Sequence, residues 1–81
     1  MDILLQSVSP LKNHELALVL TNGEHRRFDV KPYLEQGIFK ALQDPAYFCR
    51  VQGHPRFVEW PRGQDLSLDT LMARSRVMTL A

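Results

Sequence analysis

A tight turn signal at Asn22-Gly23 constrains the fold of this chain more than any other feature of its sequence. Asn-Gly between two extended runs is typical of a type I′ turn, because both residues tolerate positive φ values. The flanking runs, HELALVL and EHRRFDV, are typical of extended strands. The sequence therefore predicts an antiparallel hairpin with a two-residue loop.

A two-residue loop fixes the register of this hairpin and the side chains that share a face. It pairs Leu18 with Arg27 and Ala17 with Phe28, so Ala17, Val19, Phe28 and Val30 form a face suited to a core, with Arg26 near the turn. The other face is apolar on one strand and charged on its partner. We expect this mixed face to be half covered or to meet another chain, and it carries Leu16, Leu18, Leu20, His25, Arg27 and Asp29.

Turn residues and hydrophobic periodicity divide the rest of the chain into short elements. We expect a strand over 3–8 that ends at Ser9-Pro10, a helix over 37–43 that ends at Asp44-Pro45, and one more helical turn over 46–48. A second hairpin with a four-residue connection follows around 53–55, and Ser67 is the N-cap of the last helix. Structural roles in turns are assigned to Asn22, Gly23, Trp60, Pro61, Gly63 and Asp65.

These elements predict an α+β domain in the order β-β-β-α-β-β-α. In this domain a small antiparallel sheet of hairpins has helices packed on one face. Residues 1–76 are expected to form a single compact domain, because a chain of 81 residues is the size of one hydrophobic core. Residues 77–81 offer no cap and no identifiable partner, so we expect a frayed tail.

The order and spacing of these segments resemble a known family. The stretch LTNGEHRRFDVKPYL, followed by GIFKAL, DPAYF and FVEWPRGQDLSLDTL, is similar to domain-of-unknown-function family 2442 over roughly residues 8 to 75. The resemblance implies a small α+β fold, a bacterial cytoplasmic setting and gene neighbours that are small uncharacterised or toxin-antitoxin-like genes. Some longer members append a helix-turn-helix, which this chain does not include. The family offers no established catalytic residues to carry over.

The charge balance and the cysteine count limit the partners and the setting. Ten Lys and Arg against nine Asp and Glu leave a net charge of +1, which gives no long-range field to gather nucleic acid or an anionic membrane. Cys49 is the single cysteine, so no internal disulfide forms and a cytoplasmic setting fits best. No segment approaches the ~20 apolar residues of a membrane span, so we expect no membrane association.

The residues that carry chemistry show no catalytic or metal-binding pattern. His14, His25, His54 and Cys49 match no zinc-ligand spacing. Cys49 stands beside Phe48 among other apolar residues, so a packing role is expected for its thiol. We therefore predict no metal, no cofactor and no enzymatic activity.

Adjacent Arg26 and Arg27 suggest phosphate binding, but alternation along a strand sends their side chains to opposite faces. A phosphate-binding patch therefore needs other arginines beside Arg27. The candidate phosphate contacts are Arg27, Arg50, Arg56 and Arg62. Trp60 is expected to be a large core or edge residue rather than an exposed stacking platform for a base.

The sequence favours two functions, and an enzyme with a site shared across a dimer is a third that stays open. The first is a protein-interaction module that uses the mixed face or an open sheet edge to form a homodimer or other homo-oligomer, or to bind a small protein encoded nearby. The second is a nucleic-acid-associated regulatory or antitoxin-like component whose arginines contact phosphates. The net charge does not favour the second function.

Overall fold

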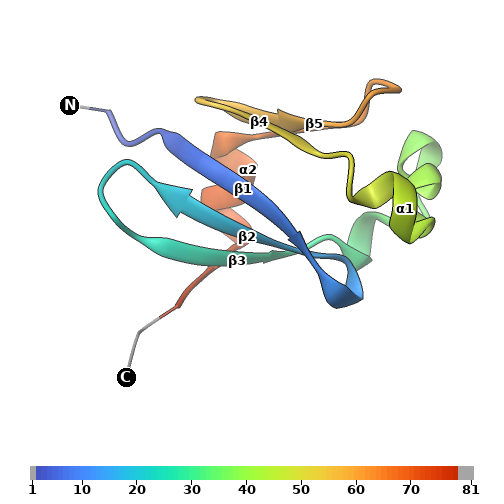
Figure 1. Ribbon diagram of the computed structural model, residues 1–81, viewed down its shortest axis with the longest axis horizontal. Coiled ribbons are helices and arrows are strands. Elements are labelled where there is room, and N and C mark those ends of the chain that lie inside the picture. Colours follow the sequence, from blue (N-terminus) through green and yellow to red (C-terminus); the bar gives the residue numbers. More distant parts are fainter. Residues whose placement is uncertain (1, 79–81) are drawn as a thin grey trace.

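The computed structural model describes residues 2–78 of the chain. It has the α+β class expected from the sequence, with two antiparallel sheets and a few short helices (Figure 1). The larger sheet has the strand order β1-β2-β3-β7 and the smaller sheet the order β4-β5-β6. The strands are β1 (Leu5–Leu11), β2 (Glu15–Leu20), β3 (His25–Asp29), β4 (Gln52–His54), β5 (Phe57–Glu59), β6 (Asp65–Ser67) and β7 (Arg76–Val77).

The helices are short and agree well with the sequence pattern. The helix predicted over 37–43 is present as a 3₁₀ helix, and the extra helical turn over 46–48 lies in α1. Ser67 caps α2 as predicted, because its Oγ accepts a hydrogen bond from the backbone N–H of Thr70 at 3.2 Å. The α-helices are α1 (Pro45–Phe48) and α2 (Leu68–Arg74), and the 3₁₀ helices are η1 (Lys12–His14), η2 (Lys31–Tyr33) and η3 (Gly37–Gln43).

One hydrophobic cluster joins the two sheets. It combines the leucines of β2 with Val58 of β5, Leu66 of β6 and Leu71 of α2. A single backbone hydrogen bond, from Leu5 N to Pro55 O at 2.9 Å, links β1 to the β4–β5 turn. The structure thus differs from the expected single sheet, because the second hairpin is part of a separate three-stranded sheet that shares the core with α2.

The hairpin at Asn22-Gly23 forms, but its loop has three residues instead of two. Leu20 N donates to Glu24 O, and Gly23 N donates to Leu20 O, both at 2.9 Å. Gly23 has a φ of +88°, whereas Asn22 is not among the residues with positive φ. A type I turn followed by one left-handed residue produces this pair of hydrogen bonds. The predicted type I′ turn is therefore wrong.

The extra loop residue shifts the β2–β3 register by one position, so the side chains of β2 lie on the opposite faces from those expected, while those of β3 keep theirs. Leu18 pairs with Arg26 instead of Arg27. The leucines of β2 point into the core, where the exposed fractions are 0%, 1% and 0% for Leu16, Leu18 and Leu20. The predicted mixed face is therefore wrong for its leucines, and only its polar members lie on the outward side: His25, Arg27 and Asp29.

Arg26 lies on the covered side of the sheet and connects three segments. Its Nε donates to Glu24 Oε1 at 2.8 Å. Its Nη1 donates to Met72 O and to Ser75 Oγ, each at 3.2 Å. The side chain is 15% exposed, so this guanidinium is mostly removed from water and satisfied by the protein. It ties the β2–β3 loop to the end of α2.

The segment WPRGQ forms a second loop of the same kind. Trp60 N donates to Gln64 O at 2.9 Å and Gly63 N donates to Trp60 O at 3.1 Å, with a φ of +102° at Gly63. Pro61 follows Trp60, at the turn position where proline is favoured. This loop joins β5 to β6, a strand that the sequence pattern did not reveal, so Asp65 begins a strand instead of lying in a turn.

The ends of the larger sheet also differ from the expected boundaries. β1 runs through Ser9 and Pro10 to Leu11, which an edge strand permits because the proline lacks a ladder donor only on its free side. At the other edge Val77 pairs with Arg26 and belongs to β7, so the compact domain extends beyond residue 76. The rest of the predicted frayed tail, 79–81, lies outside the described residues.

The two sheets approach most closely where β4 crosses β1. A Cβ atom at Gly53 would lie 2.8 Å from Val8 Cγ1, closer than real Cβ contacts allow. Val8 is β-branched and packs between the sheets, so it has little freedom to move away. Gly53 is therefore required by close packing, although its backbone conformation suits any residue.

We predict that Gly53→Ala lowers the free energy of unfolding by about 1–3 kcal/mol, because the new methyl group forces Val8 and the two sheets apart. Urea denaturation followed by circular dichroism measures the change. Gln52→Ala, at the exposed neighbouring position on β4, is the matched control and should cost less than about 0.5 kcal/mol. Equal effects of the two substitutions would contradict the close contact.

The three-residue loop predicts that substitutions at residues 22 and 23 have different effects on stability. Gly23→Ala places a Cβ in the left-handed region and should destabilise the domain by about 1–2 kcal/mol. Asn22→Gly should destabilise the domain by about 0.5–1 kcal/mol, since Asn22 does not need a positive φ and its Oδ1 accepts a hydrogen bond from Glu24 N at 3.0 Å. In a type I′ turn, both positions need positive φ values, so a marked stabilisation by Asn22→Gly would contradict the three-residue loop.

Candidate functional site

The outward side of the four-stranded sheet lies opposite the hydrophobic core and is left uncovered by the other described elements. We call it the open face. Sheet β4-β5-β6 and α2 contribute to the core on the opposite side, and in Figure 1 helix α2 lies behind the larger sheet. Strand pairing assigns these side chains to the open face: Ser7, Ser9, Leu11, Glu15, Ala17, Val19, His25, Arg27, Asp29 and Arg76.

The middle of the open face is built from small side chains. Ser9 of β1 lies opposite Ala17 of β2, and Ser7 lies opposite Val19. Both serines are exposed, whereas Ala17 and Val19 are half-buried by their neighbours within the sheet. A partner can therefore approach the backbone of the sheet closely at its centre, while longer side chains surround this centre.

The charged part of the open face lies on β3 and near the β1–β2 turn. Glu15 Oε1 lies 3.5 Å from Arg27 Nε, and Glu15 Oε2 lies 3.6 Å from Lys31 Nζ. Lys31 Nζ also lies 3.0 Å from Asp29 Oδ1. Lys12 lines a shallow depression of about 330 Å³ together with Glu15 and Arg27. Cations and carboxylates thus alternate here, with the cations in excess.

Two arginines stand directly opposite each other on this face. Arg27 of β3 pairs with Arg76 of β7 in the antiparallel register. Like charges at directly opposed positions destabilise a sheet. Within residues 2–78, Arg27 has Glu15 as its ion-pair partner, and no carboxylate forms an ion pair with Arg76. Positive charge is therefore concentrated at the β3–β7 edge.

Asp29 and Lys31 shift each other's titration. Partial burial raises the pKa of Asp29, but hydrogen bonds from the Lys31 backbone and side chain outweigh it, so the net pKa lies below the ordinary 3.8. The hydrogen bond to Asp29 raises the pKa of Lys31, with a further contribution from the charge of Glu15. Both groups are therefore charged across the neutral pH range, and they fix the η2 end of the open face.

The lowered pKa of Asp29 predicts how stability depends on pH. The Asp29 carboxylate stabilises the fold above its unfolded-state pKa of about 3.9, and this contribution is lost as pH falls through the lower folded-state value. Asp29→Asn should therefore reduce stability at pH 6 by about 0.5 kcal/mol, because the ion pair is exposed, and should reduce it by less at pH 2.5. Denaturant unfolding at the two pH values measures this. Glu35→Gln, at an exposed acid, is the control. An equal loss at both pH values would contradict the assignment.

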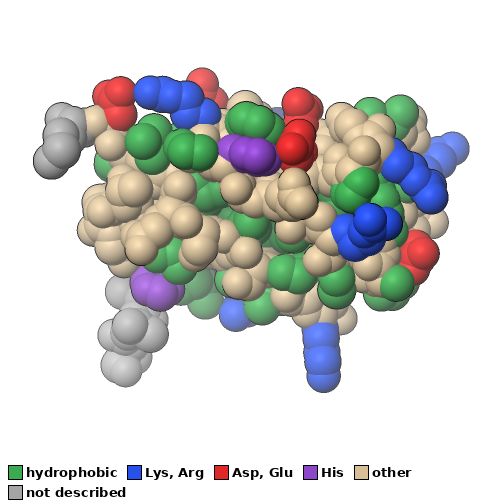
Figure 2. All heavy atoms as spheres, turned by 45° about the horizontal axis from the view of Figure 1, so that its top comes forward, with side chains coloured by type: hydrophobic (Ala, Val, Ile, Leu, Met, Phe, Trp, Pro, Cys, Tyr) green, Lys and Arg blue, Asp and Glu red, His purple; other side chains and the backbone are tan. Residues whose placement is uncertain are grey.

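The arginines proposed as phosphate contacts do not come together. Arg27 lies on the open face, whereas Arg56 lies in the β4–β5 turn with its Nη2 3.5 Å from Asp2 Oδ2. Arg62, in the β5–β6 loop, places its guanidinium 5.1 Å from the ring centroid of Tyr47, and Arg50 follows α1. Figure 2 shows Lys and Arg side chains in several separate groups on the side that it presents. The predicted set therefore does not form one phosphate-binding patch.

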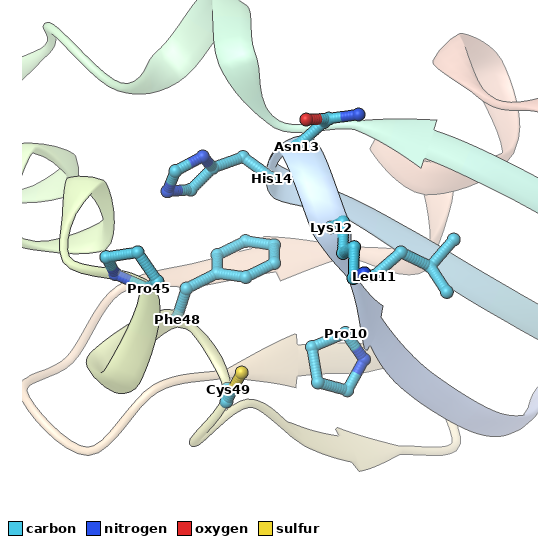
Figure 3. A pocket seen from close by; sticks show the side chains of 8 residues that line it. All are labelled: Pro10, Leu11, Lys12, Asn13, His14, Pro45, Phe48 and Cys49. Carbon is cyan, nitrogen blue, oxygen red and sulfur yellow. The ribbon is translucent and has the colours of Figure 1, made fainter.

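A small cleft lies between the β1–β2 turn and α1 (Figure 3). It has a volume of about 270 Å³ and a mostly apolar lining from Pro10, Leu11, Pro45 and Phe48, with the thiol of Cys49 at its edge. Cys49 is exposed, so its predicted packing role is wrong. Its position at the end of α1 turns it away from the core, which Phe48 occupies instead.

The turn above this cleft has an unusual backbone. Asn13 and His14 have φ values of +65° and +58°, the left-handed region that residues other than glycine seldom adopt. Three bonds hold the turn. Val30 N donates to His14 O at 3.0 Å, Lys31 Nζ donates to Asn13 O at 2.9 Å, and His14 Nε2 lies 3.2 Å from Gln43 O. The His14 ring also packs edge-on against Phe48 at 5.0 Å. These contacts account for the turn structurally.

The outward side of the smaller sheet carries one histidine, His54, which contacts an aromatic ring and a carboxylate. His54 stacks on Phe57 with ring centroids 4.4 Å apart, and its Nε2 lies 3.0 Å from Glu59 Oε1. Glu59 stands directly opposite Asp65 on β6. Two acids and one imidazole make this side acidic, in contrast to the open face. Among the described residues, no group of three His, Cys, Asp or Glu side chains is arranged to hold a metal ion.

Trp60 and the residues around it form a buried polar network. Trp60 is 1% exposed, and its indole Nε1 donates to Phe48 O at 2.9 Å, not to a carbonyl of its own loop. Tyr47 donates to Gln64 Oε1 at 2.7 Å, and Gln64 Nε2 donates to Ile38 O at 2.8 Å. Sequence reasoning missed Gln64, because nothing in a lone glutamine after a Gly signals burial. This network is structural and joins the β5–β6 loop to α1 and η3.

Comparison with known proteins places the chain in a family. The family model described as "Protein of unknown function (DUF2442)" matches residues 5–77. The chain belongs to this family. No curated protein and no solved structure matches it. The match spans both sheets and confirms the resemblance seen in the sequence, and the family description assigns no activity.

No helix in residues 2–78 has the length and apolar character needed to cross a membrane.

Proposed function

We propose that this domain is a protein-interaction module that binds an acidic protein through the open face. The observation that carries the proposal is the charge of that face. The strands of the open face carry two arginines, Arg27 and Arg76, against two carboxylates, Glu15 and Asp29. Two lysines beside this face, Lys12 and Lys31, bring the excess to two positive charges, whereas the whole chain carries +1. The excess is therefore local to this side of the molecule.

The shape of the face supports a protein partner. An uncovered antiparallel sheet with small residues at its centre allows a flat surface to approach closely, and the surrounding charges set the orientation of the partner. Four strands over about five residues span an area on the order of 300 Å². An area of this size suits a transient complex rather than an obligate one.

The charge pattern favours a different protein over a second copy or a nucleic acid. Two copies joined through this face would bring two surfaces of excess positive charge together. A nucleic acid would meet Glu15 and Asp29 among the cations, and their carboxylates repel phosphates. An acidic protein surface can place its own basic residues against these two acids. A small acidic protein encoded nearby fits this description.

The test measures binding of individually purified products of neighbouring genes to the purified domain by isothermal titration calorimetry. Arg27→Glu and Ser9→Glu should each weaken binding about tenfold or more, because they add negative charge to the open face. Arg50→Glu makes the same charge change away from this face and should leave binding unchanged.

Three outcomes would contradict the proposal. The first is binding that Arg27→Glu leaves unchanged. The second is self-association in analytical ultracentrifugation that Arg27→Glu abolishes, which would assign the face to a second copy. The third is tighter binding to a DNA or RNA oligonucleotide than to any acidic protein, with the steep salt dependence of phosphate contacts.

A further inference from the structure

The geometry points to an oxyanion-binding site between Arg27 and Arg76, at the β3–β7 edge of the open face. The ligand class is a carboxylate or phosphate group that bridges the two guanidinium groups. This inference concerns the same face as the proposed function, but it needs only an oxyanion and stands without a protein partner.

The two arginines lie next to each other on the sheet. Strand pairing places Arg27 and Arg76 directly opposite each other, with both side chains on the exposed side of the sheet. Directly opposed residues in an antiparallel pair have Cβ atoms about 5 Å apart. A guanidinium group presents its N–H donors in a plane, and carboxylate and phosphate oxygens accept such donors in pairs. One oxyanion can therefore be held by both arginines.

The surrounding protein leaves the positive charge of these two arginines only partly balanced. Glu15 shares its carboxylate between Arg27 and Lys31 at 3.5 and 3.6 Å. Asp29 forms its short contact, 3.0 Å, with Lys31, and Arg76 acts on it only through longer-range charge. No ion pair with Arg76 is formed within residues 2–78. Within residues 2–78, the guanidinium donors of Arg27 and Arg76 thus form no hydrogen bond with a protein acceptor, and Arg76 also has no ion-pair partner.

The repulsion between the opposed arginines acts against the pairing of β3 with β7. β7 contains only Arg76 and Val77, and it adds the backbone bond from Met78 N to His25 O at 2.8 Å. Repulsion between the two guanidinium groups weakens such a short strand. An anion that bridges them converts the repulsion into attraction, so ligand binding and β7 docking stabilise each other.

The experiment is a thermal melt in sodium phosphate and in sodium chloride of matched ionic strength. Phosphate at about ten times its Kd should raise the Tm of the wild-type chain by about 6 °C over chloride. Arg76→Gln and Arg27→Gln should each lose this rise. Arg74→Gln, an exposed arginine in the last turn of α2, is the matched control and should keep it.

The same variants also test whether the two arginines repel each other without phosphate. In chloride alone, Arg76→Gln should melt no lower than the wild-type chain, because it removes the like-charge pair. An equal phosphate-dependent rise in the wild-type chain and in Arg76→Gln would overturn the site. So would the absence of any rise in the wild-type chain.

A second measurement does not depend on stability. Arginine Nε–H signals in nuclear magnetic resonance spectra are followed during titration with inorganic phosphate and, separately, with a tetraglutamate peptide. Shifts confined to Arg27 and Arg76 support the site, and the ligand with the lower Kd identifies the source of the oxyanion. Shifts at neither arginine with both ligands, or equal shifts at Arg50 and Arg74, overturn it. Loss of protein-partner binding has no effect on these outcomes, so failure of the proposed function is seen separately.

Discussion

The left-handed conformation of Gly23 determines which side of this protein is its core. Because Gly23 closes a three-residue loop, the leucines of β2 face the smaller sheet and α2. A loop shorter by one residue would turn every side chain of β2 over relative to β3. Burial of three leucines, each contributing about 1.5–3 kcal/mol when fully covered, is thus tied to one backbone dihedral angle. The same three-residue loop leaves the serines and arginines of the open face on the outward side of the sheet.

Much of the architecture can be predicted from the sequence, because it depends on local signals. The N-cap at Ser67, the helix over 37–43 and the break at Asp44-Pro45 follow from residue types that act on their own backbone. The existence of the β2–β3 hairpin follows from Asn22-Gly23 in the same way. The α+β class and the family resemblance depend on these signals, and both are confirmed by the structure and the family match.

The misplaced features depend on information that a local pattern does not contain. Asn-Gly suits both a type I′ turn and a type I turn followed by a left-handed glycine, and packing of the whole β2 strand decides between them. β7 has two residues, too short for a hydrophobic period to be recognised. β6 begins at Asp65, soon after the turn residues Pro61 and Gly63, so turn-forming residue types conceal it. The unrecognised strand β7 also affects the prediction of the candidate site. Alternation along β3 places its polar members on one side of the sheet, but the sequence pattern reveals no strand at residues 76 and 77, so it does not predict the opposed arginine pair.

Arg26 couples the hairpin loop to the C-terminal segment during local unfolding of the domain. Its guanidinium is bonded to the hairpin loop through Glu24 and to the end of α2 through Met72 and Ser75, while its backbone pairs with Val77. Release of the C-terminal segment from the sheet therefore breaks bonds at the hairpin tip as well. In native-state hydrogen exchange, amides of α2, β7 and the tip would exchange together as one cooperative unit, while the amides of the smaller sheet follow their own rate.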